Sequence, residues 1–141
     1  MDRQVMDQKL ESLRRCVRRI ELKCPPQPQM LESDPDLQDI LSLNLTRAVQ
    51  LAVDMGAHII AGLEVAAPGT MGETFDVLAD QGVLDAALAL QLKKAVGFRN
   101  IAVHNYDAIN WRMVHALAQD HLVDFSRFAT AVVVWMQAQP S

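Results

Sequence analysis

Apolar residues recur every three or four positions along most of the chain, and this spacing constrains the fold more than any other feature. Residues three and four apart share one face of an α-helix, so each such run predicts an amphipathic helix. The longest run extends to about Glu64: Leu37, Leu41, Leu45, Ala48, Ala52, Met55, Ile59 and Leu63. No segment alternates apolar and polar residues as a strand would. The sequence therefore predicts an all-α fold, a helical bundle of about five to six helices.

Prolines, glycines and capping residues divide this bundle into its helices. The first helix carries an apolar stripe from Met6 to Ile20 and ends at the CPPQPQ segment, because proline lacks an amide donor and clashes inside a helix. An APG segment ends the second helix, and Gly82 ends the third. Four later helices are expected to begin at polar caps: Asp34 before Pro35, Thr70 with Glu73, Asp85 and Asn110. The last helix is expected to run from about Asp120 to Gln137.

Length and composition indicate a single globular domain over residues 1–141. Half of the 141 residues are apolar, yet no apolar run reaches the roughly 20 residues that a membrane span needs, so no membrane association is expected. Cys16 and Cys24 lie eight positions apart on one helix, too far along its axis to form a disulfide. Two unpaired cysteines fit a reducing compartment, so we expect a cytoplasmic protein.

The basic residues are unevenly distributed. The net charge is −4, which by itself argues against a strong nucleic-acid binder. Seven of the thirteen lysines and arginines nevertheless lie in the first helix, among them Arg14, Arg15, Arg18 and Arg19. Two interpretations stay open: a solvated helix face, which we favour, or a surface that faces phosphate groups.

A polar cluster interrupts the apolar pattern between residues 97 and 110, in the sequence GFRNIAVHNYDAIN. It contains Arg99, Asn100, His104 and Tyr106, the only tyrosine of the chain. Arginine offers a planar fork of donors that fits a phosphate, and histidine exchanges protons near neutral pH. Such a pair can promote cleavage of RNA by the 2′-hydroxyl of the RNA itself, without a metal ion or other cofactor. His104 would remove the hydroxyl proton while Arg99 stabilises charge on the phosphorus oxygens.

The spacing of the cluster raises a geometric question. Arg99 and His104 are five residues apart, about 140° around an ideal helix. They converge only if the helix loosens, for which Gly97 offers a place, or if a second copy of the chain faces them. Asn100 lies one turn before His104 and could orient its imidazole. The remaining histidines and both tryptophans receive plainer interpretations. His58, His115 and His121 are expected at the surface or at helix caps, and Trp111 and Trp135 as packing residues. Asp54 and His58, one turn apart, form either a polar pair in the core, which we favour, or part of a site.

The segment GFRNIAVHNY resembles the Arg-x4-His-x-Tyr signature of HepT-like toxins in the HEPN superfamily. The resemblance extends over most of residues 37–128, through LTRAVQLAVDMGAHIIAG, GETFDVLADQGVL and LKKAVGFRNIAVHNYDAIN to the final helix. The CPPQPQM insert and the arginine-rich first helix depart from the family pattern, which leaves their role open.

The resemblance implies a fold, an activity and a partner. Members are all-α homodimers that act as metal-independent ribonucleases and are paired with a minimal nucleotidyltransferase antitoxin. It implies that Arg99 and His104 are the catalytic pair, that Asn100 supports them, and that the antitoxin transfers AMP to Tyr106. The competing hypothesis is a non-enzymatic helical subunit that binds nucleotides or docks a nucleotidyltransferase, with Arg99 and His104 only binding phosphate.

Overall fold

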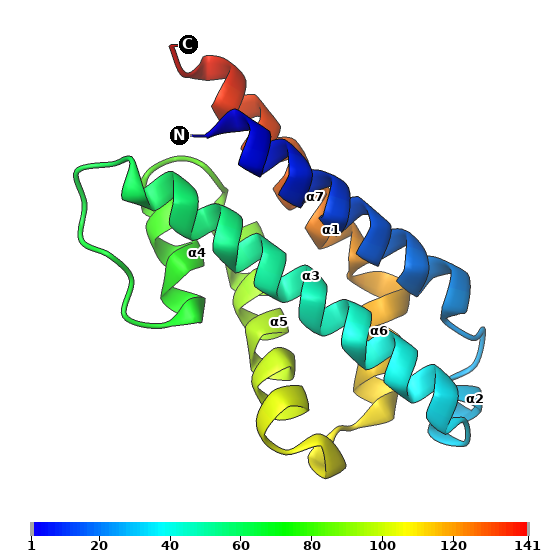
Figure 1. The fold of residues 1–141 in the computed structure, drawn as a ribbon. Coiled ribbons are helices and arrows are strands. Elements are labelled where there is room, and N and C mark those ends of the chain that lie inside the picture. Colours follow the sequence, from blue (N-terminus) through cyan, green and yellow to red (C-terminus); the bar gives the residue numbers. More distant parts are fainter. Residues whose placement is uncertain (1, 141) are drawn as a thin grey trace.

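The computed structural model describes residues 2–140, and its regular structure is helical throughout (Figure 1). It consists of seven α-helices and one short 3-10 helix: α1 (Arg3–Lys23), α2 (Pro28–Glu32), α3 (Pro35–Ala61), α4 (Met71–Asp80), α5 (Ala86–His104), η1 (Tyr106–Ala108), α6 (Trp111–Asp120) and α7 (Leu122–Ala138). No strand occurs within these residues. The all-α prediction is confirmed.

The expected capping residues begin the expected helices. Asp34 accepts hydrogen bonds from two backbone amides of the first turn of α3, and Asn110 does the same for α6. The Asp85 carboxylate accepts from the Leu88 amide at the start of α5, and the Thr70 hydroxyl accepts from the Glu73 amide at the start of α4. These side chains satisfy amides that a helix leaves unpaired at its N-terminus.

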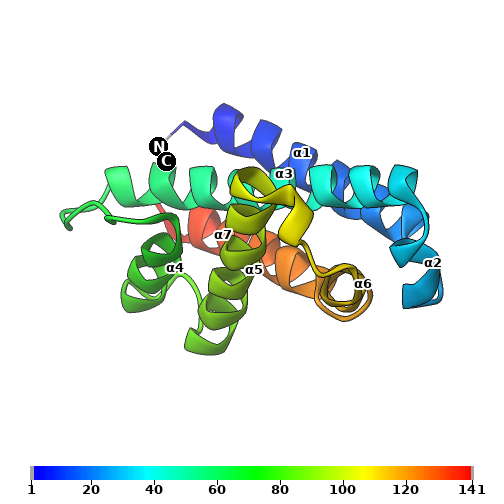
Figure 2. The same ribbon diagram turned by 90° about the horizontal axis from the view of Figure 1, so that it is seen from below.

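Helix α3 is the central element of the bundle. It runs antiparallel to α1, and α5 crosses it on another side (Figures 1 and 2). The core includes Phe75 of α4 and Phe128 of α7, whose rings meet edge to face with centroids 6.0 Å apart. The long apolar stripe of the sequence therefore lies mostly in the interior. Two polar residues of α3, Ser42 and Asn44, are also buried, and their side chains donate to backbone carbonyls of the same helix.

The structure differs from the sequence-based prediction at two element boundaries. Helix α3 ends at Ala61 with Gly62 as its C-cap, three residues before the predicted end. The short helix α2 was not predicted, because three prolines in close succession indicate the end of a helix. Here Pro28 occupies the first turn, where its missing amide costs nothing.

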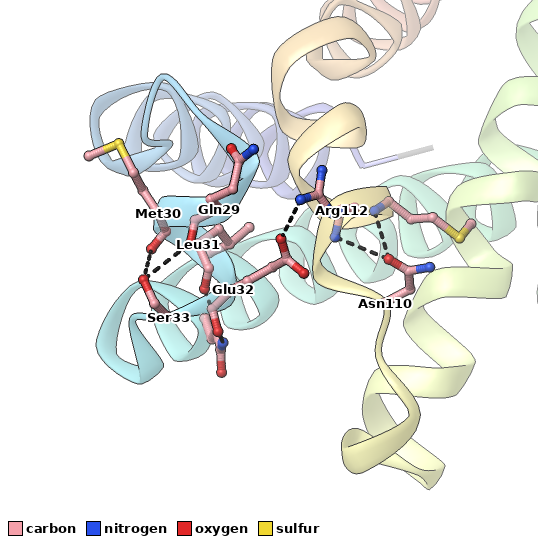
Figure 3. A network of polar contacts seen from close by, with 9 residues as sticks. Gln29, Met30, Leu31, Glu32, Ser33, Asn110 and Arg112 are labelled. Carbon is pink, nitrogen blue, oxygen red and sulfur yellow. Dashed lines mark hydrogen bonds and ion pairs between the residues drawn. The ribbon is translucent and has the colours of Figure 1, made fainter.

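Helix α2 packs against α6 and fixes the start of that helix (Figure 3). Glu32 of α2 forms an ion pair with Arg112 of α6, at 3.0 Å. Two residues before Arg112, the Asn110 side chain accepts from the amides of Arg112 and Met113. This contact anchors the chain immediately after the polar segment that contains Tyr106.

Helix α5 is continuous from Ala86 to His104, so the helix does not loosen at Gly97. Of the two ways in which Arg99 and His104 could converge, loosening of the helix is therefore not observed, and a facing second copy stays a prediction. No helix within residues 2–140 is both long and apolar enough to cross a membrane.

Candidate active site

The four residues of the polar cluster lie at one corner of the molecule, where α5 ends and η1 begins. Arg99, Asn100 and His104 belong to the last two turns of α5, and Tyr106 opens η1. The Asn105 amide donates to the Ile101 carbonyl at 2.8 Å and closes the helix between His104 and Tyr106. The motif therefore spans a helix end, and its two halves have different backbone geometry.

The Arg99 side chain is half-buried against α3. Its Nη2 donates to the Gln50 Oε1 at 3.5 Å, and its Nη1 donates to the Asn100 Oδ1 at 3.2 Å. Its Nε is buried, with no acceptor among the described residues. No carboxylate within residues 2–140 forms an ion pair with this guanidinium. A buried donor without a partner costs about 1–3 kcal/mol, and a catalytic role or a bound ion is among the features that account for such a group.

The Tyr106 hydroxyl contacts α3 near the start of that helix, at Asp39. It donates to the Asp39 Oδ1 at 2.5 Å, and the ring meets Trp111 edge to face with centroids 5.7 Å apart. Burial raises the pKa of the phenol, and the hydrogen bond to Asp39 raises it further. The side chain is 39% exposed, so it is accessible as expected, but its hydroxyl is engaged by a carboxylate.

The His104 side chain is exposed at the C-terminal end of α5, and no hydrogen bond to its imidazole is found among residues 2–140. The expectation that Asn100 orients this imidazole is not met. Instead the Asn100 Oδ1 accepts from Arg99, because the neighbouring guanidinium offers a charged donor. The structure of one chain thus holds Arg99 against α3 and leaves His104 free on the surface.

Two residues of this site were missed by the sequence analysis. Asp39 and Gln50 both lie on α3 and bind Tyr106 and Arg99 across 67 and 49 residues of sequence. They are eleven positions apart, close to three full turns, so they face the same side of the helix. Neither belongs to a recognisable motif, and only the packing of α5 and η1 against α3 reveals them.

The other histidines lie apart from the motif. His115 is buried and its Nε2 donates to the Pro25 carbonyl at 2.7 Å, so it is not the surface or capping residue that was expected. His121 occupies the junction of α6 and α7 and pairs with Asp124 at 3.2 Å. His58 accepts from the Asp2 amide, whereas Asp54 binds Gln50 and Lys9, so the expected Asp54–His58 pair is not formed.

Both tryptophans pack against the hydrophobic core, as expected. Cys16 and Cys24 are both free thiols, and burial raises the pKa of each. No group of three histidine, cysteine or acidic residues within residues 2–140 is arranged to hold a metal ion.

An apolar groove of about 700 Å³ lies beside the motif, between α5, α6 and the start of α7. Gly97, Phe98 and Ile101 line it from α5, and Met113 lines it from α6. Ile101 and Met113 are 45% and 67% exposed. His104 follows Ile101 by one turn of α5, about 60° around the helix axis, and is not itself among the residues that line the groove.

Comparison with known proteins identifies the family. The family model described as ribonuclease HepT-like matches residues 8–132. The chain is 34% identical over 124 residues to the mRNA nuclease HepT of Shewanella oneidensis MR-1. This alignment covers 88% of this chain and 92% of the relative.

Solved structures agree with this match. A toxin–antitoxin complex with AMP-PNP contains a chain with a TM-score of 0.87 and 31% identity, covering 93% of this chain and 98% of that one. The tri-AMPylated HEPN toxin of Shewanella oneidensis in complex with its MNT antitoxin gives the same TM-score and identity, covering 95% and 99%. The cytosolic protein YutE of Bacillus subtilis shares the fold, with a TM-score of 0.84 at 17% identity over 100% and 96% of the two chains. The chain therefore belongs to the ribonuclease HepT-like family of HEPN proteins.

Proposed function

We propose that this protein is the toxin of a type VII toxin–antitoxin pair, a metal-independent ribonuclease whose catalytic residues are Arg99 and His104. The observation that supports this most is the state of Arg99. Its guanidinium is held by two amide oxygens and by no carboxylate among the described residues, so its positive charge is available to a phosphate. The relatives that resemble the chain over most of its length carry the names nuclease and toxin.

In the proposed reaction, the 2′-hydroxyl of the RNA attacks the adjacent phosphorus. His104 takes the hydroxyl proton, and Arg99 stabilises the charge that develops on the non-bridging oxygens. The bond from phosphorus to the 5′-oxygen of the next nucleotide then breaks, and this oxygen takes a proton from a general acid. The products are a 2′,3′-cyclic phosphate and a free 5′-hydroxyl.

The reaction needs a base and an acid, and each chain supplies a single motif histidine. We therefore infer a homodimer in which a second copy covers the apolar groove between α5 and α6. Ile101 and Met113 are exposed in this groove, and Ile101 lies one turn before His104 on α5, so contact there brings two copies of His104 toward one shared cleft. In this dimer, Arg99 of one copy meets His104 of the other, so α5 does not have to loosen for the two residues to converge.

Tyr106 is the proposed site of control by a nucleotidyltransferase antitoxin. The phenol oxygen attacks the α-phosphorus of ATP, pyrophosphate leaves, and Asp39 is placed to accept the phenol proton. The attached AMP adds negative charge and bulk at the end of the motif opposite Arg99, on the same side of α3, and so obstructs and repels an RNA strand that approaches the site. Reaction with ATP and a cytosolic RNA target implies a cytoplasmic location.

A cleavage assay on purified protein tests this function. Single-stranded RNA is incubated with the wild type, Arg99→Ala, His104→Ala and the control His58→Ala, in EDTA. Arg99→Ala and His104→Ala should each lose about 10²–10³-fold in rate, the usual effect of losing charge stabilisation or acid–base catalysis. Their circular dichroism should match the wild type, because both residues are near a polar helix end. Equal rates for wild type and His104→Ala would support the non-enzymatic binding subunit instead.

A second arm of the same experiment tests the switch. With the cognate antitoxin, ATP and magnesium, intact mass should rise in steps of one adenylyl group while cleavage falls. Tyr106→Phe should keep its mass and its activity, because it retains Arg99 and His104 but lacks the acceptor oxygen. Equal adenylylation of Tyr106→Phe would place the acceptor elsewhere.

A further inference from the structure

A groove of about 740 Å³ lies between α1 and α3, and three arginines line it. Arg15 and Arg19 come from α1, and Arg47 comes from α3. We call this the basic groove. It holds the arginine-rich part of the first helix, the feature whose role the family resemblance leaves open.

The charges of the basic groove are mostly uncompensated. Arg19 and Arg47 are exposed, and neither forms an ion pair with a carboxylate within residues 2–140. Arg15 lies 3.5 Å from Glu11. Asp54 is the one acidic residue of the lining, and it is already bound by Lys9 and Gln50. Although the chain as a whole is acidic, this surface carries a local positive charge that suits a polyanion.

The basic groove is continuous with the candidate active site. Gln50 lines the groove and at the same time accepts from Arg99. Leu43 lines it one turn after Asp39, the residue that binds Tyr106. One stripe of α3 therefore runs from Asp39 through Leu43 and Arg47 to Gln50, and both ends of the motif contact it.

We propose that the basic groove binds the sugar–phosphate backbone of single-stranded RNA on one side of the cleaved bond; this rests on the proposed ribonuclease function. Arg19 and Arg47 present planar forks of donors to successive phosphates, the contact that arginine makes best. Leu43 is 51% exposed and offers an apolar surface to a base. A strand held in this way passes Gln50 and leads directly to Arg99. The arginines position the substrate and take no part in bond cleavage.

The test measures RNA binding separately from cleavage. In the His104→Ala background, the affinity for a short fluorescein-labelled single-stranded RNA of mixed sequence is measured by anisotropy over a range of salt concentrations. The double variant Arg19→Gln/Arg47→Gln should bind at least about tenfold more weakly at low salt. The slope of log affinity against log salt should fall by about 1.4, since each lost phosphate contact removes about 0.7.

A matched control makes the same change in charge at two arginines of α1. Arg14 and Arg18 lie on α1 but do not line the groove, and Arg14 pairs with Glu11. Arg14→Gln/Arg18→Gln should change affinity less than about twofold and keep the wild-type slope. With His104 restored, the groove variant should raise KM with little change in kcat, because it weakens binding of substrate and transition state alike.

The outcomes are distinct. Loss of binding in the groove variant only, with circular dichroism and subunit mass unchanged, supports the proposal. Equal binding by the two double variants overturns it and leaves the ribonuclease assignment intact. A groove variant that binds RNA normally but loses self-association or antitoxin binding also overturns it, because the occupant is then a protein. Failure of the wild type to cleave RNA would remove the proposed function, and the anisotropy measurement would still report whether the groove binds RNA.

Discussion

At Tyr106, burial and the Asp39 carboxylate act on the phenol in the same direction. Both disfavour the negatively charged phenolate, so the pKa is raised above its ordinary value, and a weaker hydrogen bond involving Ser42 opposes them. A tyrosine that acts as a nucleophile under these conditions needs a base beside it. The Asp39 Oδ1, 2.5 Å from the hydroxyl, is that base in the proposed adenylylation.

The single tyrosine makes this shift directly measurable. Titration of the phenolate absorbance should give a midpoint above about 10, the pKa of a free tyrosine. Asp39→Ala should lower the midpoint but leave it raised, because burial, the larger cause, remains. Because the pKa of Tyr106 is raised in the folded state, the contribution of this phenol to the free energy of unfolding is complete below about pH 10. This contribution is lost as pH rises through the folded-state pKa. An unchanged midpoint in Asp39→Ala would show that the carboxylate does not act on this phenol.

At the scale of the elements, α3 and α4 approach each other closely at Gly56. A Cβ added at this position would lie 2.7 Å from the Thr74 Cγ2 and 2.9 Å from the Leu78 Cδ1. Both neighbours are buried, so neither can move aside without disturbing the core. The glycine therefore sets the distance between the two helices, even though glycine weakens a helix by up to about 1 kcal/mol relative to alanine.

Gly56→Ala should lower the free energy of unfolding by about 1–3 kcal/mol, the usual cost of overpacking a core. Gly72→Ala in α4 is the control, because its added Cβ meets only the flexible Lys93 side chain at 3.9 Å. That variant should keep or raise stability, by up to about 1 kcal/mol. Denaturant unfolding of the two purified variants measures both effects. A stabilised Gly56→Ala would mean that α3 and α4 can separate at little cost.

The helices could be predicted from sequence because their signals are local. Asp34, Asp85 and Asn110 cap the helices that follow them within a few residues, and the apolar stripe of α3 repeats within one element. The errors also have local causes. The prolines near α2 are signals both for ending a helix and for beginning one, and the residues after Ala61 are compatible with a longer helix.

The site could be predicted only in part. Arg99, Asn100, His104 and Tyr106 stand out as a polar cluster within eight positions. Their partners Asp39 and Gln50 are ordinary polar residues of a helix, and the side chains they bind are 67 and 49 positions away. No periodicity carries that information, since it depends on how α5 and η1 pack across α3.

On the scale of the whole molecule, the main exposed apolar surface beside the motif is the face of α5 and α6. Its exposed side chains include Ile101 and Met113, and His104 follows Ile101 by one turn of α5. A single chain leaves this face uncovered, and a proposed second copy covers it. Assembly and activity are then linked, because the same contact buries the apolar side chains and joins the two motifs.

The protein should therefore be a dimer at micromolar concentration by light scattering. Met113→Glu should shift it toward the monomer and lower cleavage in parallel, since a buried carboxylate in an apolar contact is costly. Val134→Glu on α7 is the matched control: Val134 is 59% exposed and does not line the groove, so mass and activity should stay unchanged. A monomeric wild type would contradict the proposed dimer, and a dimeric Met113→Glu would place the interface elsewhere.

The attachment of both motif ends to α3 limits how this chain can change in length over evolution. One residue inserted between Asp39 and Gln50 would turn one partner about 100° away from the other, so Tyr106 and Arg99 could not both keep their contacts. Residues 62–69 form a mostly exposed loop, in which an inserted residue does not rotate any contact residue of the site. Insertions and deletions among homologues should therefore collect in that loop, while the eleven-residue spacing in α3 is inherited unchanged.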